Sequence, residues 1–223
     1  MEQGQVLPTG PAGGPILTPD DVRRRLARSV SGYRSSDPAT LAAVRGDHSL
    51  MPGGTPPAVP LTPAAVLVPL VTRPDGLSVL LTQRTQHLAA HAGQIAFPGG
   101  KQETSDADAV DAALRETEEE VGLPRDHVEV VGRLDTYVTS TGFEVTPVVG
   151  LVRAPYPVKL DPFEVAELFE VPLDFILDPA NRRRGQRERN GAIRHYFIYD
   201  YRGHEVWGAT AAMLVNLAEI LVR

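Results

Sequence analysis

The feature that most constrains the fold is a series of short apolar runs that begins at Ala64, directly after a proline-rich stretch. Residues 65–71 and 77–82 form two such runs, and an Arg-Pro-Asp-Gly turn at 73–76 joins them. Runs of this length, bounded by turn residues, are typical of buried strands. We therefore expect this part of the chain to begin a sheet.

A helix interrupts the series of strands. Residues 94–97 predict a third strand that ends at Pro98-Gly99-Gly100, and a helix is expected over 106–121, ended by Gly122. Strands and helices mixed in this order favour a layered α/β domain over a helix bundle or a β-sandwich. The elements expected further along are strands at 128–134, 143–152 and 195–201, a short helix at 164–169 and an amphipathic closing helix at 209–222.

The first sixty residues differ from the rest of the chain in composition and pattern. Residues 1–17 are rich in Gly and Pro and predict a flexible tail. Thr18 and Pro19 are typical of a helix start, and apolar residues at four-residue spacing extend that helix to about Ser31. Its apolar stripe packs either on its own domain or on a second copy in a homodimer. A short helix at 38–45 and a proline-rich linker at 49–63 complete this extension of residues 18–63, and the main domain is expected over 64–223.

Composition narrows the class of protein. The chain has 223 residues, a net charge of −6 and no cysteine, which excludes disulfides, thiolate nucleophiles and zinc–thiolate sites. A negative charge argues against a nucleic-acid partner, which usually meets a basic face. No apolar run is long enough to cross a membrane, and the N-terminus lacks the pattern of a signal peptide. We expect a cytoplasmic protein.

The strongest candidates for functional residues lie on the helix expected over 106–121. Glu116, Glu119 and Glu120 lie at positions i, i+3 and i+4 and share one face. Like charges at this spacing repel each other, and a bound cation would neutralise them. Ligands that are all oxygen suit Mg²⁺ or Mn²⁺. Taken alone, the helix is also explained by a solvated acidic face, but the Gly99-Gly100 turn before it can bring backbone close to a phosphate or metal and favours a site.

Together, the glycine turn and this helix resemble the Nudix box. Gly100 and the run from Arg115 to Leu123, which reads Arg-Glu-Thr-Glu-Glu-Glu-Val-Gly-Leu, match the two ends of that pattern. Asp106 stands where the first glutamate of the box is usual, and the box is one residue longer than the common form. The resemblance implies a Nudix-type α/β/α sandwich with a mixed sheet. The partner of Arg115 remains open between Glu103, Asp106 and Asp108.

The flanking sequence is similar to the coenzyme A pyrophosphatase branch of that family. The similarity covers roughly residues 64–222. It implies hydrolysis of coenzyme A to 4′-phosphopantetheine and adenosine 3′,5′-bisphosphate. Alternatives are hydrolysis of ADP-ribose, dinucleotides or nucleoside triphosphates, and a non-catalytic module that senses a nucleotide. The matching segments are 81–85, 87–88, 93–100, 140–143, 145–150, 164–167, 171–173 and 203–213.

The resemblance also implies roles for individual residues. Glu116 and Glu120 would bind the metal, with the Gly100 carbonyl completing the shell, and Glu119 would be a ligand or orient water. Arg115 belongs to the implied catalytic set. Glu164 is the downstream candidate for the general base, with Glu119 and Glu120 as alternatives.

Several residues have two interpretations that the sequence leaves open. Gly99 and Gly100 are candidates for contact with the substrate phosphates, and Arg84 either binds substrate or forms a salt bridge. The arginines between Arg182 and Arg189 predict a basic loop, which is either solvated or holds the 3′-phosphate of coenzyme A. Trp207 either stacks on adenine or belongs to the core.

Overall fold

We describe the protein from a computed structural model that covers residues 17–28, 44–51, 53–57, 60–88, 91–189 and 192–223. The α-helices in these ranges are α1 (Pro19–Arg28), α3 (Ala109–Val121), α4 (Leu173–Leu177) and α5 (Gly208–Val222). The strands are β1 (Arg45–Gly46), β2 (Thr62–Arg73), β3 (Gly76–Arg84), β4 (Ile95–Ala96), β5 (Gly99–Lys101), β6 (Val128–Arg133), β7 (Tyr137–Val138), β8 (Phe143–Arg153), β9 (Val165–Pro172), β10 (Arg182–Arg189), β11 (Ala192–Tyr201) and β12 (His204–Trp207).

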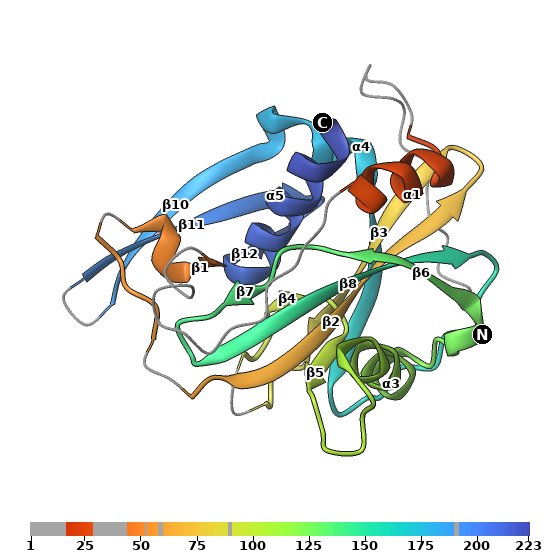
Figure 1. Ribbon diagram of the computed structural model, residues 1–223, viewed down its shortest axis with the longest axis horizontal. Coiled ribbons are helices and arrows are strands. Elements are labelled where there is room, and N and C mark those ends of the chain that lie inside the picture. Colours follow the sequence, from red (N-terminus) through yellow and green to blue (C-terminus); the bar gives the residue numbers. More distant parts are fainter. Residues whose placement is uncertain (1–16, 29–43, 52, 58–59, 89–90, 190–191) are drawn as a thin grey trace.

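The main sheet is mixed. Its strand order is β1-β7-β8-β2-β3-β4, with β5 paired to β2, β6 to β8 and β9 to β3. The long central strands β2 and β8 run parallel, from Thr62 opposite Phe143 to Thr72 opposite Arg153, and β3 and β9 pair antiparallel beside them. A second, antiparallel sheet of β10, β11 and β12 extends to one side of the molecule (Figure 1).

Helices cover both faces of the main sheet, so the prediction of an α/β/α sandwich is confirmed. Along β2, Ala65, Leu67 and Val71 face one hydrophobic cluster that includes Ala112 and Val121 of α3. Alternate residues such as Val68 and Leu70 face the other cluster, which includes α5, α4 and α1. This alternation is the two-residue period of a strand buried on both sides. Figure 1 shows α3 on one side of the sheet and α5 with α1 on the other.

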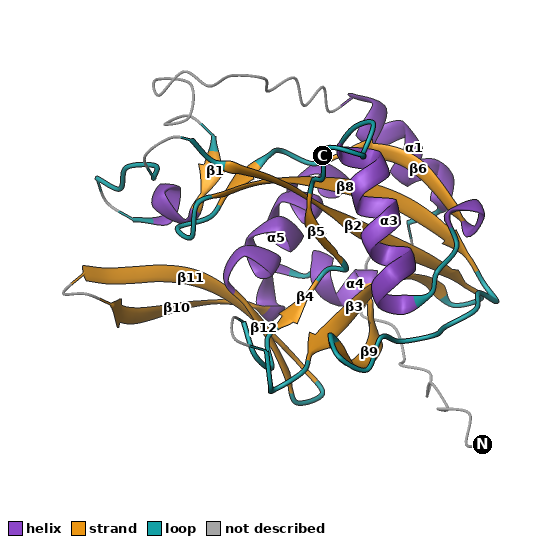
Figure 2. Cartoon of the chain, turned by 90° about the horizontal axis from the view of Figure 1, so that it is seen from below, coloured by secondary structure: helices purple, strands orange, loops and turns teal. Residues whose placement is uncertain are grey.

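The closing helix is buried rather than amphipathic. Eleven of the residues of α5, from Thr210 to Leu221, are buried, and they include the polar Thr210 and Asn216. Asn216 accepts a hydrogen bond from the Asp135 backbone N–H at 2.9 Å, which satisfies its polar group. Figure 2 shows that α5 lies between the main sheet and the β10–β12 sheet, so it is covered from two sides and the amphipathic prediction is wrong.

Two local predictions were also wrong. Residues 164–169 do not form a helix, because β9 pairs with β3 over almost its whole length and tertiary pairing overrides the local helical pattern. The arginine-rich stretch is not a loop but strand β10, which pairs with β11 from Arg182 opposite Tyr199 to Arg189 opposite Ala192.

The N-terminal segment is attached to the main domain. Val22 and Leu26 of α1 are buried in the same cluster as α5, and Arg23 forms an ion pair with Glu129 of β6. The apolar stripe of this helix therefore packs on its own domain. Residues 29–31 of the predicted helix, and all but the last two residues of the helix predicted at 38–45, lie outside the described residues; Val44 and Arg45 are not helical.

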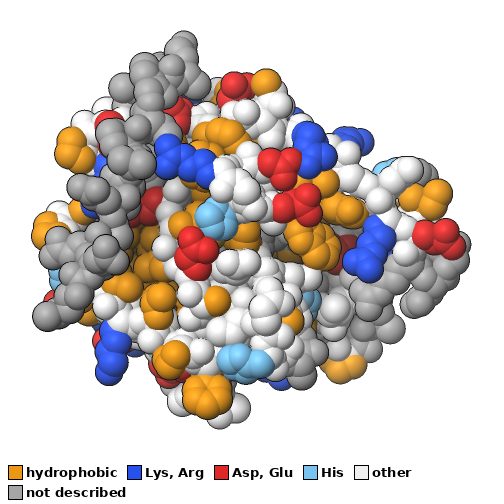
Figure 3. All heavy atoms as spheres, turned by 180° about the vertical axis from the view of Figure 1, so that it is seen from behind, with side chains coloured by type: hydrophobic (Ala, Val, Ile, Leu, Met, Phe, Trp, Pro, Cys, Tyr) orange, Lys and Arg blue, Asp and Glu red, His pale blue; other side chains and the backbone are white. Residues whose placement is uncertain are grey.

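None of the helices in the described ranges combines the length and apolar character that a membrane span needs. On the coloured part of the face in Figure 3, acidic and basic side chains are scattered among hydrophobic ones.

Candidate active site

The glycine turn is held against β2 by strand pairing. β5 pairs antiparallel with β2, with Ala65 opposite Gly100 and Val66 opposite Gly99. Gly99 has φ +150°, and a Cβ at this position would lie 2.4 Å from the Ala65 carbonyl oxygen. Only glycine tolerates this backbone conformation and this close approach. The pairing places the turn directly beside α3.

Two glutamates of α3, Glu116 and Glu120, lie against this turn. A Cβ on Gly100 would lie 2.5 Å from Cδ of Glu116, so the missing side chain makes room for that carboxylate. Oε2 of Glu120 accepts a hydrogen bond from the Gly99 N–H at 3.1 Å. Glu116 and Glu120 are one helical turn apart, so consecutive residues of the turn contact the two carboxylates.

Burial raises the pKa of both of these carboxyls. Glu120 is only 4% exposed, and this burial raises its pKa to about 8 against the opposing effects of the Gly99 hydrogen bond and the Arg84 charge. Burial also raises the pKa of Glu116, although Arg115 works against it. Groups whose charged form is this costly are ones that a bound cation would stabilise.

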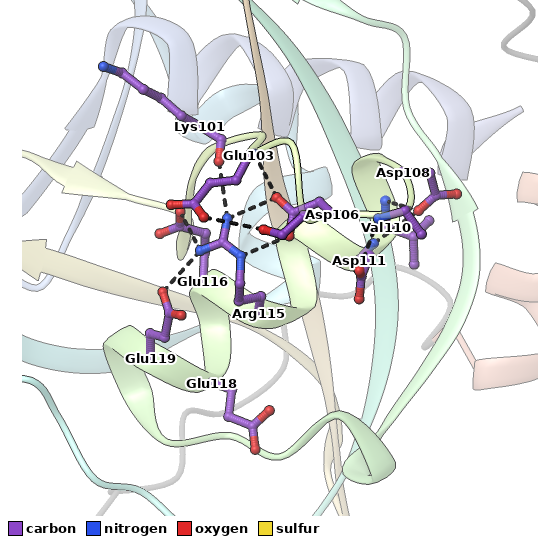
Figure 4. Close-up of polar contacts among 12 residues, drawn as sticks. Lys101, Glu103, Asp106, Asp108, Val110, Asp111, Arg115, Glu116, Glu118 and Glu119 are labelled. Atoms are coloured by element: carbon purple, nitrogen blue, oxygen red, sulfur yellow. Dashed lines mark hydrogen bonds and ion pairs between the residues drawn. The ribbon is translucent and has the colours of Figure 1, made fainter.

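Arg115 lies at the centre of a set of acidic groups (Figure 4). Its guanidinium donates to both carboxylate oxygens of Asp106, at 2.8 and 3.0 Å, and to Glu116 and Glu119 at 3.0 Å each. A further bond of 3.2 Å reaches the carbonyl oxygen of Lys101 in β5. The Arg115 bond lowers the pKa of Asp106 to about 2. Arg115 therefore ties α3 to the loop that follows the glycine turn.

The open question about the partner of Arg115 is answered by Asp106. Asp108 instead caps α3, because its Oδ1 accepts bonds from the Val110 and Asp111 N–H groups, and the helix therefore begins at Ala109 rather than at Asp106. Glu118 is exposed and points away from Arg115 in Figure 4.

A second arginine joins the helix to the loop before β9. Arg84, at the end of β3, lies 3.5 Å from Glu120 and 3.4 Å from Glu164. The loop itself is fixed by the backbone bond from Asp161 N to Glu120 O at 2.9 Å, and by Thr85 N to Glu164 O at 2.9 Å. Glu164 remains partly open to solvent, with 44% of its side chain exposed. A carboxylate close to the cluster and open to water is well placed to accept a proton from that water.

The predicted site residues are thus brought together around α3. Within the described ranges, no three acidic or histidine side chains are arranged to hold a metal ion as they stand. Instead, Arg115 forms ion pairs with Glu116 and Glu119, and Arg84 forms one with Glu120. The donors fit a hard divalent cation, because all are carboxylate oxygens on one helix face and the Gly100 position leaves Glu116 room beside the backbone.

The opposite face of α3 packs on the sheet, where Ala112 and Ala113 are fully buried. Thr117, which stands where the Nudix pattern has an apolar residue, is also fully buried, and its hydroxyl donates to the Ala113 carbonyl oxygen at 2.6 Å. This bond within the helix removes the cost of burying the hydroxyl.

A cavity of about 370 Å³ opens beside the carboxylates, and Arg84 and Gly99 belong to its wall. Its other walls come from separate parts of the chain. The residues lining it are Asp47, Met51, Val66, Arg84, His91, Gln94, Ile95, Ala96, Phe97, Gly99, Thr139, Ser140, Thr141, Arg187, Arg194, His195, Tyr196, Trp207, Gly208, Ala209 and Thr210. The volume and the mixture of aromatic and polar groups suit a small organic ligand.

The arginines of β10 have several environments. Arg183 pairs with Asp200, whereas Arg182 and Arg184 lie over the ring of Phe197 at 5.6 and 5.5 Å. Arg187 alone among these lines the cavity. Trp207, for which the core was one alternative, lies only partly buried at the cavity wall.

Sequence reasoning missed the contributions of Asp47, Arg194 and Tyr196 to the cavity. Asp47 comes from the N-terminal extension and accepts bonds from the Tyr137 hydroxyl at 2.7 Å and the Ser140 N–H at 2.6 Å. No local pattern indicates this contact, because it joins residues ninety positions apart. For Arg194 and Tyr196 the sequence did contain an indication. The Asn190-Gly191 dipeptide between two strand-like runs predicts a tight turn, and the turn determines which residues of the two strands lie opposite each other.

A helix with aligned carboxylates behind a glycine turn, on an α/β/α sandwich, defines a class of hydrolases that act on phosphoric anhydrides. The family model described as the NUDIX domain matches residues 61–188, more than half of the chain. Nudix hydrolase NudL of Yersinia pestis, named as uncharacterized, is 42% identical over 156 residues, which cover 70% of this chain and 78% of the relative. The chain belongs to the Nudix family and is a pyrophosphohydrolase.

Two of the solved structures that match this chain are Nudix proteins. RenU of Mycobacterium smegmatis has a TM-score of 0.47 at 23% identity, with 72% of this chain and 86% of that chain covered. The NUDIX domain of NrtR from Shewanella oneidensis, solved with ADP-ribose, has a TM-score of 0.41 at 18% identity and covers 68% of this chain and 85% of its own.

Proposed function

We propose that this Nudix hydrolase cleaves the pyrophosphate bond of coenzyme A to give 4′-phosphopantetheine and adenosine 3′,5′-bisphosphate. The observation that carries the proposal is the position of the segment similar to coenzyme A pyrophosphatases. Arg84 and the run Gln94 to Phe97 from that segment line the cavity, next to the carboxylates of α3. Residues that distinguish this branch therefore lie where a substrate would be recognised.

Glu116, Glu119, Glu120 and the Gly100 carbonyl are proposed to hold Mg²⁺ or Mn²⁺. A divalent ion bound there would supply charge to polarise the phosphoryl oxygens and acidify a water. Glu116 and Glu119 would exchange their bonds to Arg115 for the ion, and Arg115 would keep its two bonds to Asp106. Arg115 would thus act as a positioning residue that ties the helix to the loop after the glycine turn.

Glu164 is the proposed general base. Its carboxylate is exposed to solvent beside Arg84, and the backbone bonds of Thr85 and Asp161 fix the loop that carries it. It would accept the proton that the attacking water loses as the new P–O bond forms and the bond to the bridging oxygen breaks. Arg84 lies between Glu164 and Glu120 and would hold the base in place. Because Arg84 also lines the cavity, it would contact the phosphates of a substrate bound there.

The proposed cell context follows from the same substrate. Coenzyme A is a small soluble molecule, so the protein is proposed to act in the cytoplasm on a nucleotide substrate without a nucleic-acid or membrane partner. A homodimer is not required by α1, because its apolar stripe is already buried on its own domain.

Product analysis by mass spectrometry tests the proposal. The purified protein is incubated with coenzyme A, ADP-ribose, NADH or a diadenosine polyphosphate, with Mg²⁺ or with EDTA, and Glu120→Gln is the matched inactive variant. We expect 4′-phosphopantetheine that depends on metal and is lost in the variant. Turnover of another substrate with coenzyme A intact would keep the site and reject this substrate. Absence of turnover by folded protein would favour a nucleotide sensor.

A further inference from the structure

Two arginines face each other across the hairpin that borders the cavity. In the antiparallel register of β10 and β11, Arg187 lies directly opposite Arg194. Opposite residues of paired strands extend from the same face of the sheet, with their Cβ atoms about 4.5–5.5 Å apart. Like charges in this position destabilise the pairing unless an anion lies between them. The hairpin therefore carries a cost that a ligand can remove.

The carboxylate of Asp47, which lines the same cavity, is bonded to Tyr137 and Ser140 rather than to either arginine. Both arginines line the cavity, and neither forms an ion pair with a described carboxylate. The Nε of Arg194 is buried and has no hydrogen-bond partner among the described residues. Arg183, on the same hairpin, has Asp200 as its partner. A buried donor without a partner is costly, so Arg194 is prepared for an acceptor that comes from outside.

The aromatic residues of the cavity lie next to the pair. Tyr196 follows Arg194 by two residues and so shares its face, and its ring lies 5.5 Å from that of Trp207 at 56°. Space for the Tyr196 ring comes from Gly185, where a Cβ would lie 2.7 Å from it. Trp207 is opposite Ile198, four residues from Arg194, which corresponds to about 13 Å along the strand. Tyr196 thus lies between the arginine positions and the Trp207 position on one face of the small sheet.

We propose that Arg187 and Arg194 form a second anion site, which binds a phosphomonoester on the ribose of the nucleotide. Two guanidinium groups suit a dianionic phosphate, to which each donates paired hydrogen bonds. Tyr196 and Trp207 would contact the base. Under the proposed function this anion is the 3′-phosphate of coenzyme A, and the pair selects coenzyme A over nucleotides that lack that group.

Kinetics on a matched substrate pair test the site. Coenzyme A and 3′-dephospho-coenzyme A share the pyrophosphate bond and differ only in the phosphomonoester. For Arg187→Gln and Arg194→Gln we expect kcat/KM on coenzyme A to fall roughly tenfold to a hundredfold, as for loss of a hydrogen bond to a charged group. The value on the dephospho compound should stay unchanged, which also shows that the variants are folded. Arg184→Gln, whose arginine lies over Phe197, is the control and should match the parent protein on both.

Binding separates this proposal from the proposed function. Calorimetric titration with adenosine 3′,5′-bisphosphate and with 5′-AMP needs no turnover. We expect the bisphosphate to bind at least about tenfold more tightly, and Arg194→Gln to remove the difference. If coenzyme A is not cleaved but this preference is found, the anion site stands and the substrate is wrong. Equal affinities, or equal losses on both substrates in the arginine variants, would overturn the anion site.

Discussion

Replacing Gly100 by alanine separates catalysis from folding at the glycine turn. The backbone of Gly100 is not in the left-handed region, so alanine fits its conformation. The added Cβ would lie 2.5 Å from Cδ of Glu116 and 2.6 Å from each of its carboxylate oxygens. Ordinary contacts between carbon atoms are about 3.5–4.0 Å, so the carboxylate must retreat by about 1 Å.

We expect this displacement of the Glu116 carboxylate to lower catalytic activity rather than stability. Glu116 is a flexible side chain whose far end can move, so the free energy of unfolding should change by less than about 1 kcal/mol. A displacement of about 1 Å in a catalytic group can lower the rate about a hundredfold. We therefore expect kcat/KM with Mg²⁺ to fall about a hundredfold while the urea midpoint stays close to that of the parent protein.

Gly99→Ala is the matched comparison, measured in the same two assays. Its Cβ would meet the backbone carbonyl oxygen of Ala65 at 2.4 Å, and φ +150° is unfavourable for alanine. Because backbone cannot move aside as a side chain can, we expect a stability loss of about 1–3 kcal/mol. The reasoning is refuted if Gly100→Ala keeps full activity, or if the two variants lose stability equally.

Three further predictions concern the helix, its protonation and the N-terminal extension. Arg115→Lys cannot reproduce the two bonds to Asp106, so steady-state kinetics should show a lower kcat with KM little changed; an unchanged kcat would contradict the positioning role. Burial raises the pKa of Glu120 to about 8, so between its unfolded value of about 4.3 and pH 8 the folded protein keeps a proton that the unfolded chain has released. Stability in EDTA should therefore fall as the pH rises from 5 to 8 in urea titrations, and Glu120→Gln should flatten this trend. Leu26→Ala, at a 3% exposed position of α1, should cost about 2–5 kcal/mol in the free energy of unfolding, whereas a change near zero would mean that α1 does not pack on the domain.

The sequence was sufficient for those features that depend on local pattern. The strands 65–71 and 77–82 lie within β2 and β3, because apolar runs and a Pro-Asp-Gly turn determine them locally. Aligned glutamates on α3 follow from helical periodicity alone. The glycine turn could be placed beside them because strand, turn and helix are consecutive in the chain.

Features that depend on distant contacts could not be predicted in the same way. β9 resembles a helix locally, but its pairing with β3 decides its conformation. The closing helix has polar Thr210 and Asn216, whose burial depends on partners at Ile95 and Asp135. The cavity wall at Asp47 and Arg194 is likewise assembled from segments that the chain order does not connect.

Binding of Mn²⁺, followed by electron paramagnetic resonance, tests most directly whether the inner carboxylates of α3 form the metal site. The titration compares the parent protein with Glu120→Gln, which changes the buried carboxylate bonded to Gly99, and with Glu118→Gln, which changes an exposed one on the same helix. We predict that Glu120→Gln weakens Mn²⁺ binding about tenfold or more and that Glu118→Gln leaves it unchanged. Equal affinities of all three proteins would contradict the assignment of the metal to this face of the helix.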